Sequence, residues 1–343
     1  MGVAGAGSPQ GWRPPSFNQG WTYHDRVGAS DRGTWLIQLM GRRYAHSTAD
    51  QWRQRLDAGQ LSVNGQRLHD DMPLEVGDRI SWRRPPWLEP AVPDQWQRIW
   101  DDGDLLVINK PSGLPVMPGG GFLVHTLTAL LQQRSQAQGE PLAPKPVHRL
   151  GRYTSGLQVC ARRPETRARL ARQFRPDGGC RKLYQAWSQR VEGLELADSL
   201  AVCTDVVERV HPLLGWVWGP EPSGDQPVRR RLTALSELTL LDRRPEGDLL
   251  QVAITTGRPH QIRIHLAQLG SPLLGDPLYL TGRALDPAVT PGDGGYLLHA
   301  WRLQGLFAID GNKGVLEAPP PFGFSHPSFG DGTLEARAGM GNG

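Results

Sequence analysis

Short runs of alternating apolar and polar residues recur between residues 96 and 317, a spacing typical of half-buried β-strands. The clearest of these runs are 105–109, 157–160, 184–187 and 249–254. Two longer segments, 124–138 and 164–174, are predicted as helices. Gly, Pro and Asp separate many of the strands. The pattern therefore predicts an α+β domain with a largely antiparallel sheet rather than a regular alternation of parallel strands and helices.

Residues 31–84 have a second pattern, that of a small separate unit. Residues 34–40 predict the opening of a helix, and Ser-Thr-Ala-Asp at 47–50 is a capping signal for another helix. A short strand then reaches the Asn-Gly pair at 64–65, which is typical of a tight hairpin turn. Residues 76–82 predict a closing strand. We therefore expect a small α/β module ahead of the larger domain.

The remaining segments are predicted from their Gly and Pro content. Residues 1–30 are rich in Gly, Pro and polar residues, and we expect a disordered arm there. Residues 85–95 hold several prolines, which forbid a regular helix and favour an extended linker. Residues 318–343 return to Pro and Gly and are expected to form a disordered tail. With 343 residues, the chain has room for two domains, 31–84 and 96–317.

The positive charge of the chain is almost entirely arginine. The formal net charge is +4, and only four residues are lysine. The planar fork of arginine suits bidentate contacts with phosphate and stacking on nucleic-acid bases. A GC-rich genome produces the same excess of arginine, so composition leaves both explanations open.

The cysteine and apolar content indicates the compartment. Cys160, Cys180 and Cys203 lack the spacing of a metal site, which favours a reducing cytoplasm over a disulfide scaffold. No apolar run approaches the ~18–20 residues of a membrane span. The N-terminus lacks the basic and apolar regions of a secretory signal. We therefore expect a cytoplasmic protein without membrane contact. The sequence carries no signal of oligomeric state, and we expect a monomer.

One short segment carries the strongest functional signal. Residues 147–157 read V-H-R-L-G-R-Y-T-S-G-L, which resembles the active-site signature H-R-L-D-x-x-T-S-G-L of the RluA-type pseudouridine synthases. Five further segments match that family in order and spacing, namely 104–116, 181–187, 255–266, 270–279 and 297–303. The resemblance implies a pseudouridine-synthase fold, with a mixed, mostly antiparallel sheet and a central RNA cleft. It also implies isomerisation of uridine to pseudouridine in structured RNA, either rRNA or tRNA.

The implied reaction involves no redox change and no energy input. Neither a metal nor a cofactor is therefore implied, and no G-x-x-x-x-G-K-[ST] phosphate loop is present. The target base must leave the helical stack, which costs a few kcal/mol. Such an enzyme needs cations for the phosphates and a side chain that fills the space left by the base.

The smaller module also resembles a known unit. Two helices followed by a hairpin with the pattern G-x-L-S-V-N-G…V-G-D are similar to the S-four-type RNA-binding domain. The arginines on or beside its helices, Arg42, Arg43, Arg53 and Arg55, are then candidate phosphate contacts. The alternative is an ordinary solvated helix surface. Agreement with the downstream domain favours RNA contact.

Site roles follow from positions in the motifs. The family's catalytic Asp is replaced by Gly151. The resemblance implies that Arg149 fills the gap left by the everted base, that Tyr184 packs on the uracil and handles a proton, and that Arg263 pairs with the acid. Motif positions imply further RNA contacts by His148, Arg152, Thr154, Ser155, Arg258, Lys110 and Lys182, the two lysines being phosphate or structural partners.

Each of these residues also has a structural alternative. Tyr184 could be a core residue of an alternating strand. His260 and His265 are five residues apart, which favours structural hydrogen bonding over a shared metal. His148 is expected to position the signature rather than act as a base. A buried Arg263 requires an anion, which could be RNA phosphate, another acid or solvent.

Gly151 divides the functional hypotheses because it can be neither base nor nucleophile. Loss of such a group removes several powers of ten in rate even where binding survives. The first hypothesis is a weak synthase. The second is a non-catalytic RNA-binding protein, a folding or assembly factor, that uses the same cleft. Asp276 is the most obvious substitute acid, although its motif position is also occupied in enzymes that retain the usual Asp.

Overall fold

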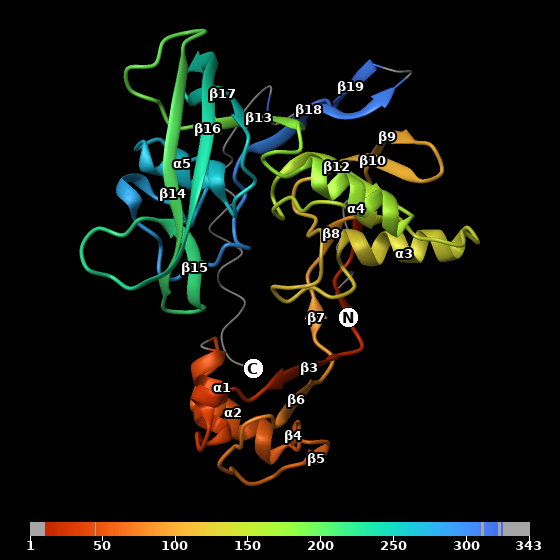
Figure 1. Ribbon diagram of the computed structural model, residues 1–343, viewed down its shortest axis with the longest axis vertical. Coiled ribbons are helices and arrows are strands. Elements are labelled where there is room, and N and C mark those ends of the chain that lie inside the picture. Colours follow the sequence, from red (N-terminus) through yellow and green to blue (C-terminus); the bar gives the residue numbers. More distant parts are fainter. Residues whose placement is uncertain (1–10, 45, 310–311, 322–323, 325–343) are drawn as a thin grey trace, which may run out of the picture.

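The computed structural model describes residues 11–44, 46–309, 312–321 and 324. Figure 1 shows a small N-terminal module, in red and orange, below a larger domain built on one extended sheet. A pair of chain segments that includes β7 and β8 runs between them. The small module contains residues of the expected segment 31–84, and the large domain contains residues of the expected segment 96–317.

The large domain contains an 11-stranded sheet. Its order is β15-β14-β16-β17-β13-β18-β12-β10-β9, with β11 beside β12 and β19 beside β18. Of the strand pairs in this sheet, β12 and β18 are parallel and the rest are antiparallel. The expectation of a mixed, mostly antiparallel sheet is confirmed. The strands are β9 (Gln97–Asp101), β10 (Leu105–Lys110), β11 (Lys145–Pro146), β12 (Ser155–Ala161), β13 (Arg181–Ser188), β14 (Ser199–His211), β15 (Gly215–Pro220), β16 (Val228–Arg244), β17 (Gly247–Ile254), β18 (Leu298–Ile309) and β19 (Asn312–Glu317).

Helices cover the sheet in two places. The predicted helices at 124–138 and 164–174 are confirmed as α3 (Leu127–Ala137) and α4 (Pro164–Gln173), which lie near β9–β12 in Figure 1. A third, α5 (Gln261–Gln268), packs against β14, β15 and β16. It is buried along nearly its whole length, and its mixed sequence gave no periodic signal. A short turn, η2 (Thr281–Arg283), lies beside α5.

A glycine joins the two halves of the sheet. The parallel contact between β12 and β18 consists of two residue pairs, Ser155 with His299 and Gly156 with Ala300. Gly156 has a φ of 106°, and any Cβ there would collide with the backbone of Ala300. Only glycine allows the strands to approach this closely. The T-S-G part of the signature therefore holds the end of β12 against the centre of the sheet.

The N-terminal module is a four-stranded sheet with two helices on one face. The capping signal is confirmed, because Thr48 and Gln51 form a reciprocal capping box at the second helix. The hairpin is also confirmed, since Asn64 and Gly65 have positive φ, as a two-residue turn of this kind requires. The elements are β3 (Trp21–Arg26), η1 (Ala29–Asp31), α1 (Leu36–Arg43), α2 (Ala49–Asp57), β4 (Leu61–Val63), β5 (Gln66–Arg67) and β6 (Arg79–Arg84), with the sheet order β3-β6-β4-β5.

The expected disordered arm is wrong for the residues that the structure describes. Residues 11–26 contain β1 (Trp12–Arg13), β2 (Ser16–Phe17) and β3, which pair with β8 (Val92–Pro93), β7 (Leu88–Glu89) and β6. The three pairings keep one antiparallel register, so they form a continuous two-stranded ribbon. The Pro-rich linker is extended, as expected, but it is the second strand of this ribbon. Residues 1–10 lie outside the described part of the chain.

The tail prediction also needs a correction. Ala318 and Phe324 are buried. The indole of Trp187 donates to the Phe324 carbonyl at 2.8 Å, and His299 bonds to the Ala318 carbonyl. The first residues of the expected tail therefore pack on the large domain. Residues 322–323 and 325–343 lie outside the described part. Within the described ranges, no helix is long and apolar enough to span a membrane.

Candidate active site and RNA-binding residues

The signature loop lies between β11 and β12 and is held from below by Lys110. This residue ends β10 and is fully buried. Its ammonium group donates to the carbonyls of Pro111, Leu114 and Arg152 at 2.8, 2.9 and 3.0 Å. Burial, with Arg152 nearby, lowers the pKa of Lys110 to about 7. Contact with RNA phosphate is therefore wrong for Lys110, which fixes the loop from inside the fold.

Gly151 lies exposed in this loop, directly above a buried tyrosine. A Cβ built on Gly151 would approach the Tyr296 hydroxyl more closely than real Cβ atoms approach other groups. That hydroxyl also lies 3.4 Å from Thr154 Oγ1. Gly151 does not have a left-handed backbone, so the conformation itself does not forbid a side chain. The Tyr296 hydroxyl therefore occupies the space into which a side chain at 151 would project.

Arg263 has an anion within the protein. Its Nε and Nη2 donate to the two carboxylate oxygens of Asp276 at 2.7 and 2.8 Å, and both side chains are buried. The guanidinium carbon lies 4.1 Å from the ring centre of Tyr296 and 4.7 Å from that of Tyr279. Burial disfavours the charged form, but the bonds to Asp276 outweigh it and raise the pKa of Arg263. The anion that balances Arg263 is therefore another acid, Asp276, rather than RNA phosphate or solvent.

Asp276 is fully engaged in this arrangement. One of its oxygens also accepts from the backbone N–H groups of Leu278 and Tyr279. Its side chain has no exposed surface. Asp276 therefore neutralises Arg263 and fixes the following turn, and it does not present a free carboxylate to a substrate in this conformation.

Tyr184 is brought beside the same loop. It lies on β13 opposite Ala300 of β18, and Gly156 of β12 lies on the other side of Ala300. Its ring is partly buried between two core clusters, one containing Leu150 and the other Tyr296. Burial raises the pKa of Tyr184 above the usual range of a phenol, so its hydroxyl stays protonated at neutral pH. The structure thus gathers Tyr184, the signature loop, Tyr296 and Arg263.

Three residues assigned to RNA instead hold the loop in place. His148 accepts from the Val159 N–H at 3.0 Å and stacks on Phe174, with ring centres 4.4 Å apart. Burial lowers the pKa of His148 to about 3, so the ring is neutral and positions the signature, as expected. Thr154 and Ser155 are buried, and Ser155 bonds to His299 at 2.9 Å. Direct RNA contact by Thr154 and Ser155 is therefore wrong.

The phosphate contact considered for Lys182 is also wrong. It is buried, and its ammonium group donates to the carbonyls of Phe174 and Thr255. It is therefore a structural partner rather than a phosphate contact. His260, which precedes α5, and His265 within α5 are likewise structural: His260 bonds to the Tyr279 hydroxyl and His265 to the Ser236 hydroxyl.

Three predicted cations retain solvent access around the large domain. Arg149 is exposed and has no ion pair in the described part of the chain. Arg152 donates from Nε to the Gly113 carbonyl and lies over the rings of Phe122 and Tyr153. Arg258 donates from Nε to the Thr233 carbonyl. These arginines remain the candidates for contact with RNA near the loop.

The predicted arginines of the N-terminal helices are already occupied. Arg42 and Arg43 form ion pairs with Asp31, and Arg43 also pairs with Asp25. Arg53 approaches Asp71 at 3.9 Å. Arg55 is partly buried, with its guanidinium over the rings of Trp52 and Trp82. The helix side is therefore largely neutralised within the protein, which weakens its assignment as the phosphate-binding surface.

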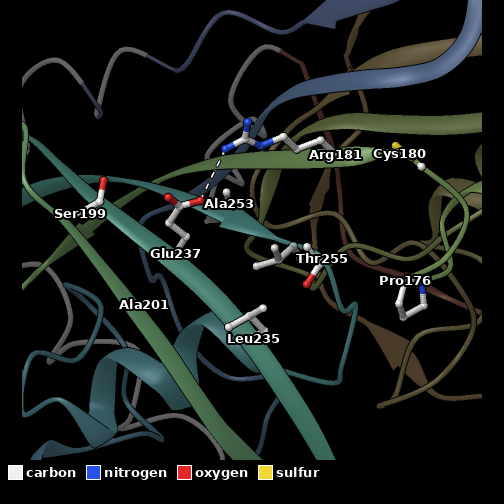
Figure 2. Close-up of a pocket in the computed structure, with 11 residues that line it drawn as sticks. Pro176, Cys180, Arg181, Ser199, Ala201, Leu235, Glu237, Ala253 and Thr255 are labelled. Carbon is white, nitrogen blue, oxygen red and sulfur yellow. Dashed lines mark ion pairs between the residues drawn. The ribbon is translucent and has the colours of Figure 1, made fainter.

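A pocket of about 580 Å³ lies elsewhere on the large sheet (Figure 2). Arg181 and Glu237 form an ion pair across it, with 3.5 Å between their charged atoms. Glu237 follows Ser236, whose side chain contacts α5, so the pocket opens on the opposite face of the sheet. Neither Gly151 nor Arg263 lines it. It is separate from the candidate active site.

Tyr296 is the residue of this site that the sequence patterns missed. It directly precedes the segment 297–303, but no motif position marks it. Its contact with Gly151 joins residues 145 positions apart along the chain. A spacing pattern does not reveal such a contact, because it depends on how the strands are arranged in the folded sheet.

Comparison with known proteins agrees with this fold and identifies the family. The family model of RNA pseudouridylate synthases matches residues 104–268. An uncharacterized RNA pseudouridine synthase of Synechocystis is 39% identical over 289 residues, covering 83% of this chain and 94% of the relative. RNA pseudouridine synthase 5 of Arabidopsis thaliana is 32% identical, covering 90% of this chain and 94% of the relative. The chain belongs to the RNA pseudouridine synthase family, and the RluA-type assignment fits.

Two further comparisons concern the fold and a relative with a named RNA. The structure of human RNA pseudouridylate synthase domain containing 4 has a TM-score of 0.51 and 23% identity, covering 67% of this chain and 90% of that one, which shows the shared fold. Ribosomal large subunit pseudouridine synthase D of Nitrosomonas europaea is 33% identical over 229 residues, covering 65% of this chain and 61% of the relative.

Proposed function

We propose that this chain binds structured RNA in the cytoplasm and isomerises uridine to pseudouridine within it. The observation that carries the proposal is the assembled site: the signature loop clamped by Lys110 lies beside Tyr184, Tyr296 and the Arg263–Asp276 pair. Family membership supplies the reaction class. A relative named for the large ribosomal subunit gives rRNA priority over tRNA as the substrate to test.

The roles follow from the environment of each group. Arg149 is exposed beside Gly151 and is placed to enter the space left by an everted base. Tyr184 presents a protonated phenol, which is able to donate a hydrogen bond but not to accept a proton as a base at neutral pH. Arg263 is held with its charge balanced by Asp276, so it supports the loop without requiring RNA.

A specific observation favours the second candidate, an RNA-binding protein without turnover. Gly151 offers no carboxylate, and Asp276 is sealed against Arg263. Without an acid at the sugar, catalysis loses several powers of ten while binding is retained. RNA folding or assembly is the function that then remains for the same site.

Mapping pseudouridines in total cellular RNA, with and without the gene, separates the two candidates. If the chain is a synthase, deletion of its gene leaves at least one uridine unmodified, and the wild-type gene restores the modification. A binding protein gives an unchanged pseudouridine map but is recovered with a defined RNA after cross-linking. Loss of a site without restoration by the wild-type gene contradicts the proposal.

A further inference from the structure

The N-terminal sheet has one face without helices. Ile80 and Trp82 of β6 are buried against α1 and α2, so the alternate residues Arg79 and Arg83 point to the opposite side. The strand register adds three residues to this side: His24 lies opposite Ser81, Arg26 opposite Arg79, and Arg67 opposite Ser62. We name this surface the open sheet face, defined by His24, Arg26, Arg67, Arg79 and Arg83.

The open sheet face has a single sign of charge. Its four arginines are exposed, and none forms an ion pair in the described part of the chain. The other residues that share the face by register, Thr22, Ser62 and Ser81, are uncharged. On the helix side of the same module, by contrast, Arg42, Arg43 and Arg53 all have aspartate partners.

Such an arrangement is unfavourable for the free protein. Arg26 and Arg79 are directly opposite each other on neighbouring strands, where like charges repel and destabilise a sheet. A solvated surface that serves only solubility commonly mixes both signs of charge. Four unpaired cations on one small sheet therefore indicate a surface shaped for an anion with several charges.

The surface is also hollowed. One hollow, of about 820 Å³, is lined by Arg67 and Arg83 of the open sheet face together with residues 19–22, 58–60 and 84–86. A second, of about 1010 Å³, is lined by Arg26, Arg79 and Asn64, and also by Asp25, whose carboxylate pairs with Arg43 of the helix side. His24 lines both, so the two hollows adjoin.

We propose that the open sheet face, rather than the helix side, is the surface of this module that grips the phosphate backbone of structured RNA. The choice of RNA as the polyanion rests on the proposed function, whereas the choice of surface rests on the charges and hollows of the open sheet face. Arginine forks bind phosphate in bidentate fashion, and each neutralised phosphate releases condensed counterions. The occupant is the backbone of a folded RNA, and the uridine to be modified lies further along it.

The test uses the full chain and bulk tRNA as the probe. Arg79→Ala with Arg83→Ala removes two charges from the open sheet face. Arg42→Ala with Arg53→Ala removes two charges from the helix side and is the matched control. Dissociation constants are measured by fluorescence anisotropy at several salt concentrations, and thermal melts check that each variant is folded.

The sheet-face variant is expected to bind tRNA at least about tenfold more weakly, with a slope of log K against log salt lower by roughly two. The helix-side variant is expected to stay within about threefold of wild type. Because the sheet-face change relieves repulsion, its melting temperature is not expected to fall. Equal loss in both variants, or wild-type binding by the sheet-face variant, overturns the assignment.

Two further outcomes separate this inference from the proposed function. If the wild-type chain binds no RNA, the proposed function fails, and the RNA assignment of the face fails with it. If wild-type binding is intact and the sheet-face variant is unaffected, only the inference fails. Polyglutamate serves as a competitor of another class: if it displaces tRNA as well as unlabelled tRNA does at equal charge, the face takes acidic protein, and the assignment to RNA is wrong.

Discussion

Arg263 and the arginines of the open sheet face carry the same charge in opposite situations. Arg263 is sealed between two tyrosine rings and bonded to both oxygens of Asp276. Arg26, Arg79 and their neighbours are exposed and have no anion in the described part of the protein. The comparison separates a cation whose charge is balanced inside the fold from cations whose charge is left to the solvent or to a ligand. Exposed arginines without an ion pair are therefore better candidates for contact with a polyanion than a buried, paired arginine such as Arg263.

The largest expected effect concerns the sealed pair. Asp276→Asn leaves the Arg263 charge buried without its partner, which costs about 3–5 kcal/mol of unfolding free energy. The matched control is Glu237→Gln, which breaks the exposed pair with Arg181 and costs about 0–1 kcal/mol. Urea denaturation measures both. Similar losses in the two variants would show that the Arg263 site is not sealed.

A smaller effect is expected where Tyr296 faces Gly151. Gly151→Asp alone forces a side chain against the Tyr296 hydroxyl and costs about 1–3 kcal/mol through overpacking. In the presence of Tyr296→Phe the same substitution is expected to cost less than about half as much, because the obstructing hydroxyl is absent. A double-mutant cycle by urea denaturation measures the coupling.

The same cycle bears on turnover. The double variant restores a carboxylate and the space for it, so its pseudouridine formation on a target RNA is expected to exceed that of wild type by at least about tenfold. Gly151→Asp alone is expected to gain much less. Additive stability changes, with no coupling between the two positions, would contradict the contact between them.

The unfolding free energy is expected to fall at acid pH because of His265, which is fully buried in α5. Burial lowers the pKa of His265 to about 4, below the value near 6.5 of an unfolded chain. The unfolded state therefore binds more protons below pH 6.5, so stability falls as the pH is lowered from 6.5 toward 4. Replacing His265 with Asn is expected to reduce this slope by up to about 1.4 kcal/mol per pH unit. Denaturation between pH 6.5 and 5 tests it, and an unchanged slope would place His265 in solvent.

The smallest effect on stability is expected on the open sheet face. Arg79→Ala should change the unfolding free energy by no more than about 0.5 kcal/mol, because its side chain is exposed and unpaired. Removal of one charge from the pair with Arg26 should make any change favourable. A loss of 2 kcal/mol or more, measured by the same denaturation, would mean that Arg79 supports the fold, and the contrast with Arg263 would disappear.

Local patterns predicted the local elements well. The capping box at Thr48, the hairpin turn at 64–65 and the helices α3 and α4 depend on neighbours within a few residues, and all are confirmed. The ordered strands at residues 11–26 were missed because their partners lie at 79–93, and nothing in the local composition marks them.

Motif positions predicted which residues gather but not how deeply they are buried. Lys110 and Ser155 belong to the site, yet the polar groups of both side chains form their hydrogen bonds inside the protein. The open sheet face was missed for a related reason. Arg26, Arg67 and Arg79 come from three strands that are distant along the chain, and only the pairing register brings them onto one side.

The two-stranded ribbon formed by residues 12–26 and 79–93 sets the distance between the N-terminal module and the large domain. Glu89, on this ribbon, accepts hydrogen bonds from the backbone N–H groups of Leu123 and His125, which anchors the ribbon to the large domain. A double strand resists stretching and folding back far more than a single linker does. The ribbon therefore fixes the distance between the open sheet face and the signature loop, and under the proposals above this distance sets how many nucleotides separate the bound phosphates from the modified uridine.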